Sequence, residues 1–132
     1  MINLNMTLNE QHASVVLKAL ELYARIGTGQ LNELFWHPSL NKIELEKLEE
    51  AMKLLHEVKR IAFPQLKEPG DCLAIRNEDV SIESKNAYDI LQVMKHEWVM
   101  ADNKKDMEHS IWRGEPKIAG NQPLIGCQVQ KV

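Results

Sequence analysis

The segment from Thr7 to Gly27, TLNEQHASVVLKALELYARIG, decides the fold class of this chain. Its apolar residues recur at helical spacing, which predicts one amphipathic helix from about residue 8 to residue 26. Thr7 and Glu10 match a capping box, in which a hydroxyl and a carboxylate satisfy free backbone N–H groups. Gly27 stands where a left-handed residue often ends a helix. The apolar positions are Leu8, Val15, Val16, Ala19, Leu22, Tyr23 and Ile26.

The same periodicity predicts three further helices, over residues 30–36, 42–62 and 85–101. Asn41 can cap the second of the long helices, and Ser84 can cap the last one. An amphipathic helix of this length cannot bury its apolar stripe alone. We therefore expect the helices over 8–26 and 42–62 to form an antiparallel hairpin through the short helix, with helix 85–101 packed on it.

The segment over residues 64–83 lacks a helical pattern. Pro69-Gly-Asp71 marks a turn, and Cys72–Ile75 and Val80–Ile82 fit either short strands or an extended loop. Residues 70–83 are therefore open to two interpretations, a β-hairpin and an irregular segment.

The chain over residues 103–132 is rich in Gly and Pro. Ser110–Arg113 and Leu124–Val129 are possible short strands within it. The expected fold class is mainly α, with a short irregular or β-containing C-terminal tail. Residues 1–132 are expected to form a single domain, because this length suits one compact core.

Composition and charge indicate an ordinary globular protein, with 44% hydrophobic and 27% charged residues. The net charge of −3 does not favour binding to a nucleic acid polymer. Cys72 and Cys127 stand alone, without a Cys/His cluster, which indicates free thiols in a reducing compartment. No signal peptide or membrane span is predicted. We expect a cytoplasmic protein that needs no metal or cofactor.

The sequence carries no catalytic motif, and we expect a protein that is not an enzyme. No His-Glu-x-x-His or Gly-x-Ser-x-Gly pattern occurs, and the histidines show no metal-ligand spacing. The glutamates of the helix over 42–62 fall at neighbour distance from Lys and Arg, which is typical of a solvated charged face.

Two places are candidate ligand contacts. Gly27-Thr-Gly29 precedes a helix and follows Arg25, so bare N–H groups and a guanidinium can together hold an anion such as phosphate; the alternative interpretation is a simple hinge. Trp112 beside Arg113 can stack on a base and bind a phosphate. The alternative there is a tryptophan packed on the helices and an arginine in solvent.

Three stretches, Ala19–Gln30, Asn86–His96 and Pro123–Ile125, resemble small accessory proteins of tailed bacteriophages and prophages. Within that group the chain is similar to the Thoeris anti-defence sponges. The resemblance implies an oligomer built from dimers, acting in the infected bacterial cell. It also implies a pocket between protomers that binds a cyclic ADP-ribose isomer or a cyclic oligonucleotide without chemistry.

The residues that fit such a pocket divide by chemical role. Arginines would hold phosphates, aromatic rings would stack on a base, and amides would bind ribose or base edges. The candidates are Arg25, Arg113, Trp112, Tyr88, Asn86 and Gln30. A second hypothesis, from a different class, is an inhibitor or adaptor that binds a host protein through the acidic helical face.

Overall fold

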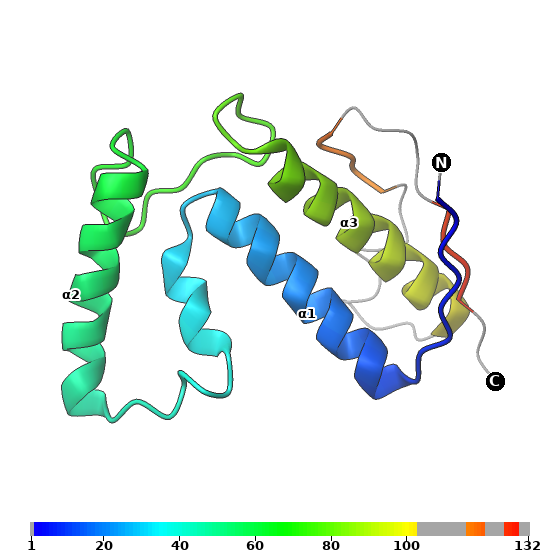
Figure 1. Cartoon of the computed structure of the whole chain (residues 1–132), viewed down its shortest axis with the longest axis horizontal. Coiled ribbons are helices and arrows are strands. Elements are labelled where there is room, and N and C mark those ends of the chain that lie inside the picture. The colour runs from blue at the N-terminus through cyan, green and yellow to red at the C-terminus, as the bar shows by residue number, and fades with distance from the viewer. Residues whose placement is uncertain (1, 103–115, 121–125, 130–132) are drawn as a thin grey trace.

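The computed structural model describes residues 2–102, 116–120 and 126–129. Its elements, in chain order, are α1 (Glu10–Gly27), the 3₁₀ helix η1 (Leu31–Trp36), α2 (Leu45–Ala62) and α3 (Ile82–Asp102) (Figure 1). The mainly helical fold class is confirmed. The described part of the chain contains no strand: residues 72–75 and 80–81 are irregular and Ile82 begins α3. The possible strand at 110–113 lies outside the described residues.

The helices α1 and α3 lie antiparallel and form the main packed pair (Figure 1). Gly27 at the end of α1 meets Ser84 in the first turn of α3, and the two backbones approach closely because glycine has no side chain there. Further along, Lys95 of α3 lies 3.9 Å from the Glu21 carboxylate of α1. The buried apolar residues on these two helices are Ala24, Ala87, Leu91, Val93 and Val99.

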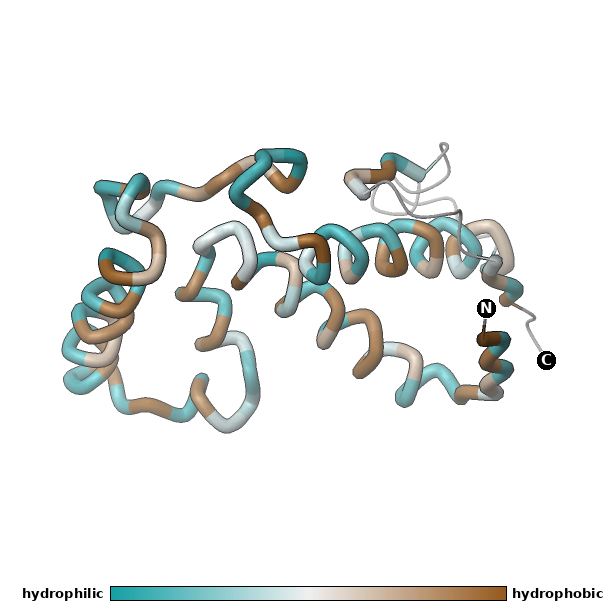
Figure 2. Tube along the Cα trace, turned by 45° about the horizontal axis from the view of Figure 1, so that its top comes forward, coloured by the Kyte–Doolittle hydropathy of each residue, from teal (hydrophilic) through white to brown (hydrophobic). Residues whose placement is uncertain are grey.

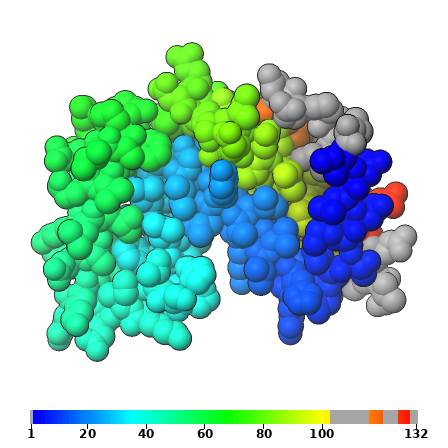
Figure 3. All heavy atoms as spheres, in the orientation of Figure 1, coloured from blue at the N-terminus to red at the C-terminus, as the bar shows by residue number. Residues whose placement is uncertain are grey.

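The partner of α1 differs from the predicted hairpin. α1 packs along α3, whereas α2 contacts η1 and neither of the other long helices. In Figure 1, η1 lies between α1 and α2, and it therefore holds α2 away from α1. Figure 3 shows the resulting hollow between the cyan part of the chain and the blue half of α1.

The segment that connects α2 to α3 is irregular but has a small core of its own. Leu66, Leu73 and Val80 are buried together, with Phe63 and Ile75 packed against them. The N–H group of Leu73 donates to the carbonyl of Thr28 at 2.9 Å, which ties this segment to the end of α1. Burial of apolar side chains therefore orders the connection, without the ladder of hydrogen bonds that a β-hairpin would need.

The ends of α1 correct two predictions. Asn9, not Thr7, caps α1, and its side-chain oxygen accepts the N–H group of His12 at 2.8 Å. Gly29, not Gly27, has the left-handed backbone, with φ of 87°. Gly27 remains helical where it meets α3.

The third long helix begins earlier than predicted, at Ile82. The Ser81 hydroxyl accepts the N–H group of Ser84 at 3.1 Å, so Ser81 is the capping residue and Ser84 is buried inside the first turn. At α2 the cap position belongs to Glu44, whose side chain makes no capping hydrogen bond, and Asn41 lies outside the helix. Among the described residues, no helix has the length and apolar character needed to cross a membrane.

Candidate functional site

Arg25, the first predicted ligand contact, sits in a polar cluster where α1 ends. Its guanidinium lies 2.9 Å from Glu21 and 3.2 Å from Glu33, and it donates to the Gln30 side chain at 3.3 Å. The same group stacks over the ring of Trp36 at 5.2 Å from the centroid. The two carboxylates therefore neutralise the positive charge of the guanidinium, with which a bound phosphate would have to pair.

The glycines beside Arg25 do not present free N–H groups in this conformation. The N–H groups of Thr28, Gly29 and Gln30 donate to the carbonyls of Arg25 and Ile26 at 3.0 to 3.1 Å. These hydrogen bonds satisfy the last carbonyl groups of α1 and leave the three N–H groups unable to bind an anion, which agrees with the alternative interpretation of a hinge. A Cβ atom on Gly29 would meet the Leu66 side chain at 2.5 Å, which gives this glycine a second, packing role.

The other predicted contacts lie elsewhere or outside the described chain. Asn86 and Tyr88 are half-buried on α3. The Asn86 oxygen would lie 3.5 Å from a Cβ atom added at Gly120, so Asn86 borders the C-terminal segment. Trp112 and Arg113 fall outside the described residues. The structure thus brings Arg25 and Gln30 together, and the combined ligand site stays a prediction.

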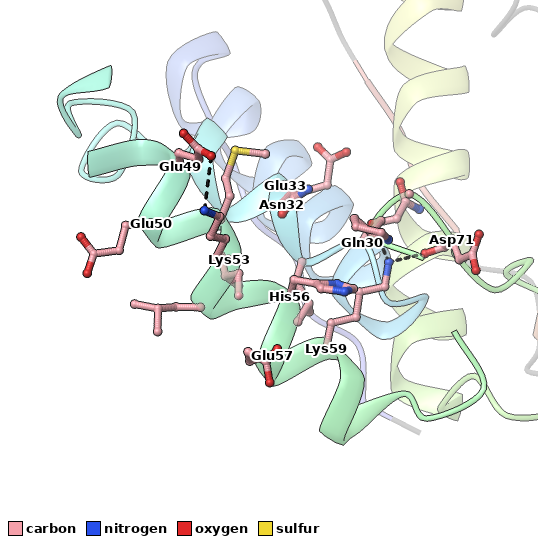
Figure 4. A pocket seen from close by; sticks show the side chains of 16 residues that line it. Gln30, Asn32, Glu33, Glu49, Glu50, Lys53, His56, Glu57, Lys59 and Asp71 are labelled. Atoms are coloured by element: carbon pink, nitrogen blue, oxygen red, sulfur yellow. Dashed lines mark hydrogen bonds and ion pairs between the residues drawn. The ribbon is translucent and has the colours of Figure 1, made fainter. Parts of the chain in front are cut away.

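A groove of about 650 Å³ lies between η1, α2 and the turn at Pro69 to Asp71 (Figure 4). This volume falls within the range that small-molecule sites occupy, roughly 300–1,000 Å³. Its polar and charged lining residues are Gln30, Asn32, Glu33, Glu49, Glu50, Lys53, His56, Glu57, Lys59 and Asp71.

Two polar atoms of this lining are buried without a hydrogen-bond partner. They are Oε2 of Glu33, from η1, and Nδ1 of His56, from α2. The other carboxylate oxygen of Glu33 pairs with Arg25, so only one side of the carboxylate is satisfied. A buried polar atom without a partner is costly, by about 1–3 kcal/mol.

The two lysines of the groove are both engaged by other groups. Lys59 is buried, and its ammonium donates to the carbonyl of Pro69 at 2.9 Å and to that of Asp71. Figure 4 shows the Lys59 side chain reaching toward the turn. Lys53 pairs with Glu49 at 3.4 Å. The groove is lined by four glutamates and one aspartate against these two lysines, so its charge is negative.

Part of this site could be found in the sequence. The helical pairs of glutamate with Lys or Arg on α2 are confirmed by Lys53 with Glu49 and by Arg60 with Glu57 at 3.0 Å. No local sequence pattern distinguishes Lys59 from the other basic residues of this helix or His56 from an ordinary helix histidine. The groove itself depends on where η1 lies, which no local pattern shows. No group of three or more His, Cys, Asp or Glu that could hold a metal ion occurs in the described part.

Comparison of the chain with protein-family models, with curated proteins and with solved structures finds no match.

Proposed function

We propose that the protein is a binding module that docks a basic, amphipathic segment of a partner protein along α2. One observation carries this proposal. Leu54, Val58 and Ile61 stand one helical turn apart and have exposed fractions of 63%, 56% and 77%. Helical geometry places them on the side of α2 opposite Met52, His56 and Lys59. We call these three residues the outer stripe. Leu54 also borders the groove, so the stripe begins at its edge.

The outer stripe is unusual for a helix of a small globular protein. A surface helix commonly has one apolar face, and here the half-buried Leu48 and Leu55 already supply it. α2 makes its helix contacts with η1 alone, and the second face stays more than half exposed in the described chain. Brown segments mark the hydrophobic positions of α2 in Figure 2. A row of exposed apolar residues at helical spacing is the pattern by which a helix engages a partner segment.

The charge beside the outer stripe selects the kind of partner. Glu50 lies one turn from Leu54 along the helix and is exposed. Glu57 lies one turn from Ile61, and it is exposed and paired with Arg60 at 3.0 Å. A partner with lysines or arginines next to its own apolar residues would complement them.

The experiment measures the binding of two fluorescently labelled model peptides by fluorescence anisotropy. Both are amphipathic helices with leucine on the apolar face; one has lysine on its polar face and the other has glutamate. We expect the Leu/Lys peptide to bind, more weakly at high salt, and the Leu/Glu peptide not to bind. Replacing Leu54, Val58 and Ile61 together by Gln should weaken binding by at least about tenfold, the ratio that 1.4 kcal/mol produces. The matched control is Leu45→Gln, which should leave the affinity unchanged. Leu45 is also on α2 and is 84% exposed, but it lies on the side of the helix opposite the outer stripe.

Equal binding of both peptides, or an unchanged affinity in the triple variant, would reject the proposal. The mass of the protein in solution is determined on the same sample. A dimer that the triple variant dissociates would identify a second copy as the occupant, and would also overturn it.

A second candidate is the function that the phage resemblance implies, sequestration of a cyclic nucleotide signal in the cytoplasm of an infected bacterium. It is supported by the volume of the groove and by Trp36, whose side chain is 65% exposed beside the Arg25 guanidinium. We rank it second because carboxylates surround both Arg25 and the groove. Calorimetric titration with cyclic ADP-ribose isomers and cyclic dinucleotides tests it, and Arg25→Ala should abolish any heat of binding.

A further inference from the structure

We propose that Asp89 of α3 and Arg76 of the preceding segment form a binding site for a peptide that bends at a glycine. The chain's own residues 116–120 occupy this site as an internal ligand, and a partner segment of the same chemistry can replace them. Figure 1 shows residues 116–120, in orange, beside α3. The site is separate from the outer stripe, because α2 contacts neither α1 nor α3 among the described helices.

The site binds the backbone of its ligand. The Asp89 carboxylate accepts the successive N–H groups of Ala119 and Gly120 at 2.7 Å and 3.1 Å. Arg76 donates to the carbonyl of Ile118 at 3.0 Å. Two successive N–H groups that converge on one anion require a bend in the peptide, and the chain bends at Gly120. All of these contacts reach backbone groups, which every peptide carries.

Burial of Asp89 makes the site dependent on a ligand. The residue is only 4% exposed, and a buried carboxylate is unfavourable unless it accepts hydrogen bonds. Among the described residues, the N–H groups of Ala119 and Gly120 are its partners. If the segment leaves, these donors must be replaced. A second peptide that bends in the same way supplies both of them.

Glycine is the residue that the site selects. A Cβ atom added at Gly120 would lie 2.7 Å from Oδ2 of Asp89 and 3.5 Å from the Asn86 side-chain oxygen. Any larger residue there would therefore displace the carboxylate that binds the backbone. Lys117 is exposed, so the side chain three positions before the glycine is not selected.

The internal ligand is attached locally enough to be replaced. None of residues 116–120 is fully buried, and Arg76 is exposed. A segment with few buried contacts opens at a lower free energy than packed helices do. The segment can thus leave Asp89 while α1 and α3 stay packed.

The test is fluorescence anisotropy with a labelled peptide that has the sequence of residues 114–122. In the unmodified chain the internal segment competes with it, at an effective concentration of roughly 1 mM. Gly120→Val should expel that segment and strengthen peptide binding by at least about tenfold. The control is Gly126→Val, which should keep the affinity of the unmodified chain, since a Cβ atom there meets no described atom within 4 Å.

Two further variants test the residues of the site. In the Gly120→Val chain, Asp89→Asn should weaken peptide binding by about tenfold or more, because the bonds to a charged acceptor are lost. Arg76→Gln should also weaken it. Arg76 is exposed, so this variant remains informative if Asp89→Asn disturbs the fold, which circular dichroism checks. A peptide with valine in place of its glycine should not bind.

The mass of the unmodified protein in solution distinguishes the source of a replacing segment. A dimer that excess peptide dissociates would identify residues 116–120 of a second copy, and a monomer would assign the segment to another protein. Both results support the site.

Three results would each overturn the inference: no peptide binding by the Gly120→Val chain, equal binding of the glycine and valine peptides, or full affinity without the Asp89 carboxylate. Because the Leu/Lys peptide test depends on the outer stripe of α2, either test can succeed while the other fails.

Discussion

The buried carboxylate of Asp89 accepts the backbone N–H group of Ala119 at 2.7 Å, and it thereby joins α3 to a segment 30 positions further along the chain. The same carboxylate accepts the N–H group of Gly120 at 3.1 Å. Nearby, Arg76 donates to the carbonyl of Ile118 at 3.0 Å. Residues 116–120 are thus attached to α3 through backbone groups, which explains why an acidic residue can be buried on this helix.

Replacing Asp89 by Asn should loosen this attachment. The neutral amide is a weaker acceptor than the carboxylate, so we expect a loss of about 1–2 kcal/mol in the free energy of unfolding. Urea denaturation measures the loss, and hydrogen exchange of the Ala119 and Gly120 amides should become faster. Asp79→Asn, at an exposed position, is the control. Unchanged amide exchange in the Asp89 variant would contradict the role assigned to this carboxylate.

Replacing Gly27 by Ala should separate α1 from α3. A Cβ atom at this position would lie 1.9 Å from the Ser84 hydroxyl oxygen and 2.4 Å from its Cβ atom. Overpacking of this kind costs about 1–3 kcal/mol and outweighs the higher helix propensity of alanine. The melting temperature should fall, and adding Ser84→Gly should restore part of it. Gly70→Ala, where a Cβ atom meets nothing within 4 Å, should leave the melting temperature nearly unchanged.

Replacing Lys59 by Met should release the turn at residues 69–71 from α2. The ammonium binds the carbonyls of Pro69 and Asp71, and hydrogen bonds to a charged group contribute about 1.5–3 kcal/mol. Urea denaturation should show a loss of that size. In Lys53→Met the change should stay within about 0.5 kcal/mol, because the pair with Glu49 is exposed. Equal losses of unfolding free energy in the two variants would show that the hydrogen bonds of Lys59 to the turn add no stability beyond that of an exposed ion pair.

Cys127 should react more slowly with iodoacetamide than Cys72. Burial raises the pKa of the Cys127 thiol, and the negative charge of Glu97 raises it further, so less thiolate is present at neutral pH. Cys72 is exposed. Mass spectrometry of single-cysteine variants at neutral pH follows the two rates, and denaturant should bring them together. If Cys127 reacts as fast as Cys72 in the folded protein, its segment does not lie beside Glu97.

The candidate site shows where prediction from local pattern ends. Arg25 and Gln30 are near each other in sequence, so their proximity was expected, and they are hydrogen-bonded in the structure. Of the two carboxylates around Arg25, Glu21 lies one turn away on the same helix and follows from helical spacing. Glu33 arrives from η1, and its position depends on the bend after α1, which no local pattern shows. A guanidinium considered alone suggests a phosphate ligand, whereas the same group between Glu21 and Glu33 does not.

The sequence by itself determined where the helices lie along the chain, because apolar periodicity acts over one or two turns. The residues at the helix caps differ from those that the sequence indicated. It also indicated the exposed ion pairs of glutamate with Lys or Arg on α2, which depend on helical spacing alone. Only the tertiary structure decided that α1 packs on α3, since that choice depends on a close approach between Gly27 and Ser84, residues distant in sequence. The groove and the outer stripe follow from the same choice, because α2 without a long-helix partner keeps one face toward η1 and another toward solvent.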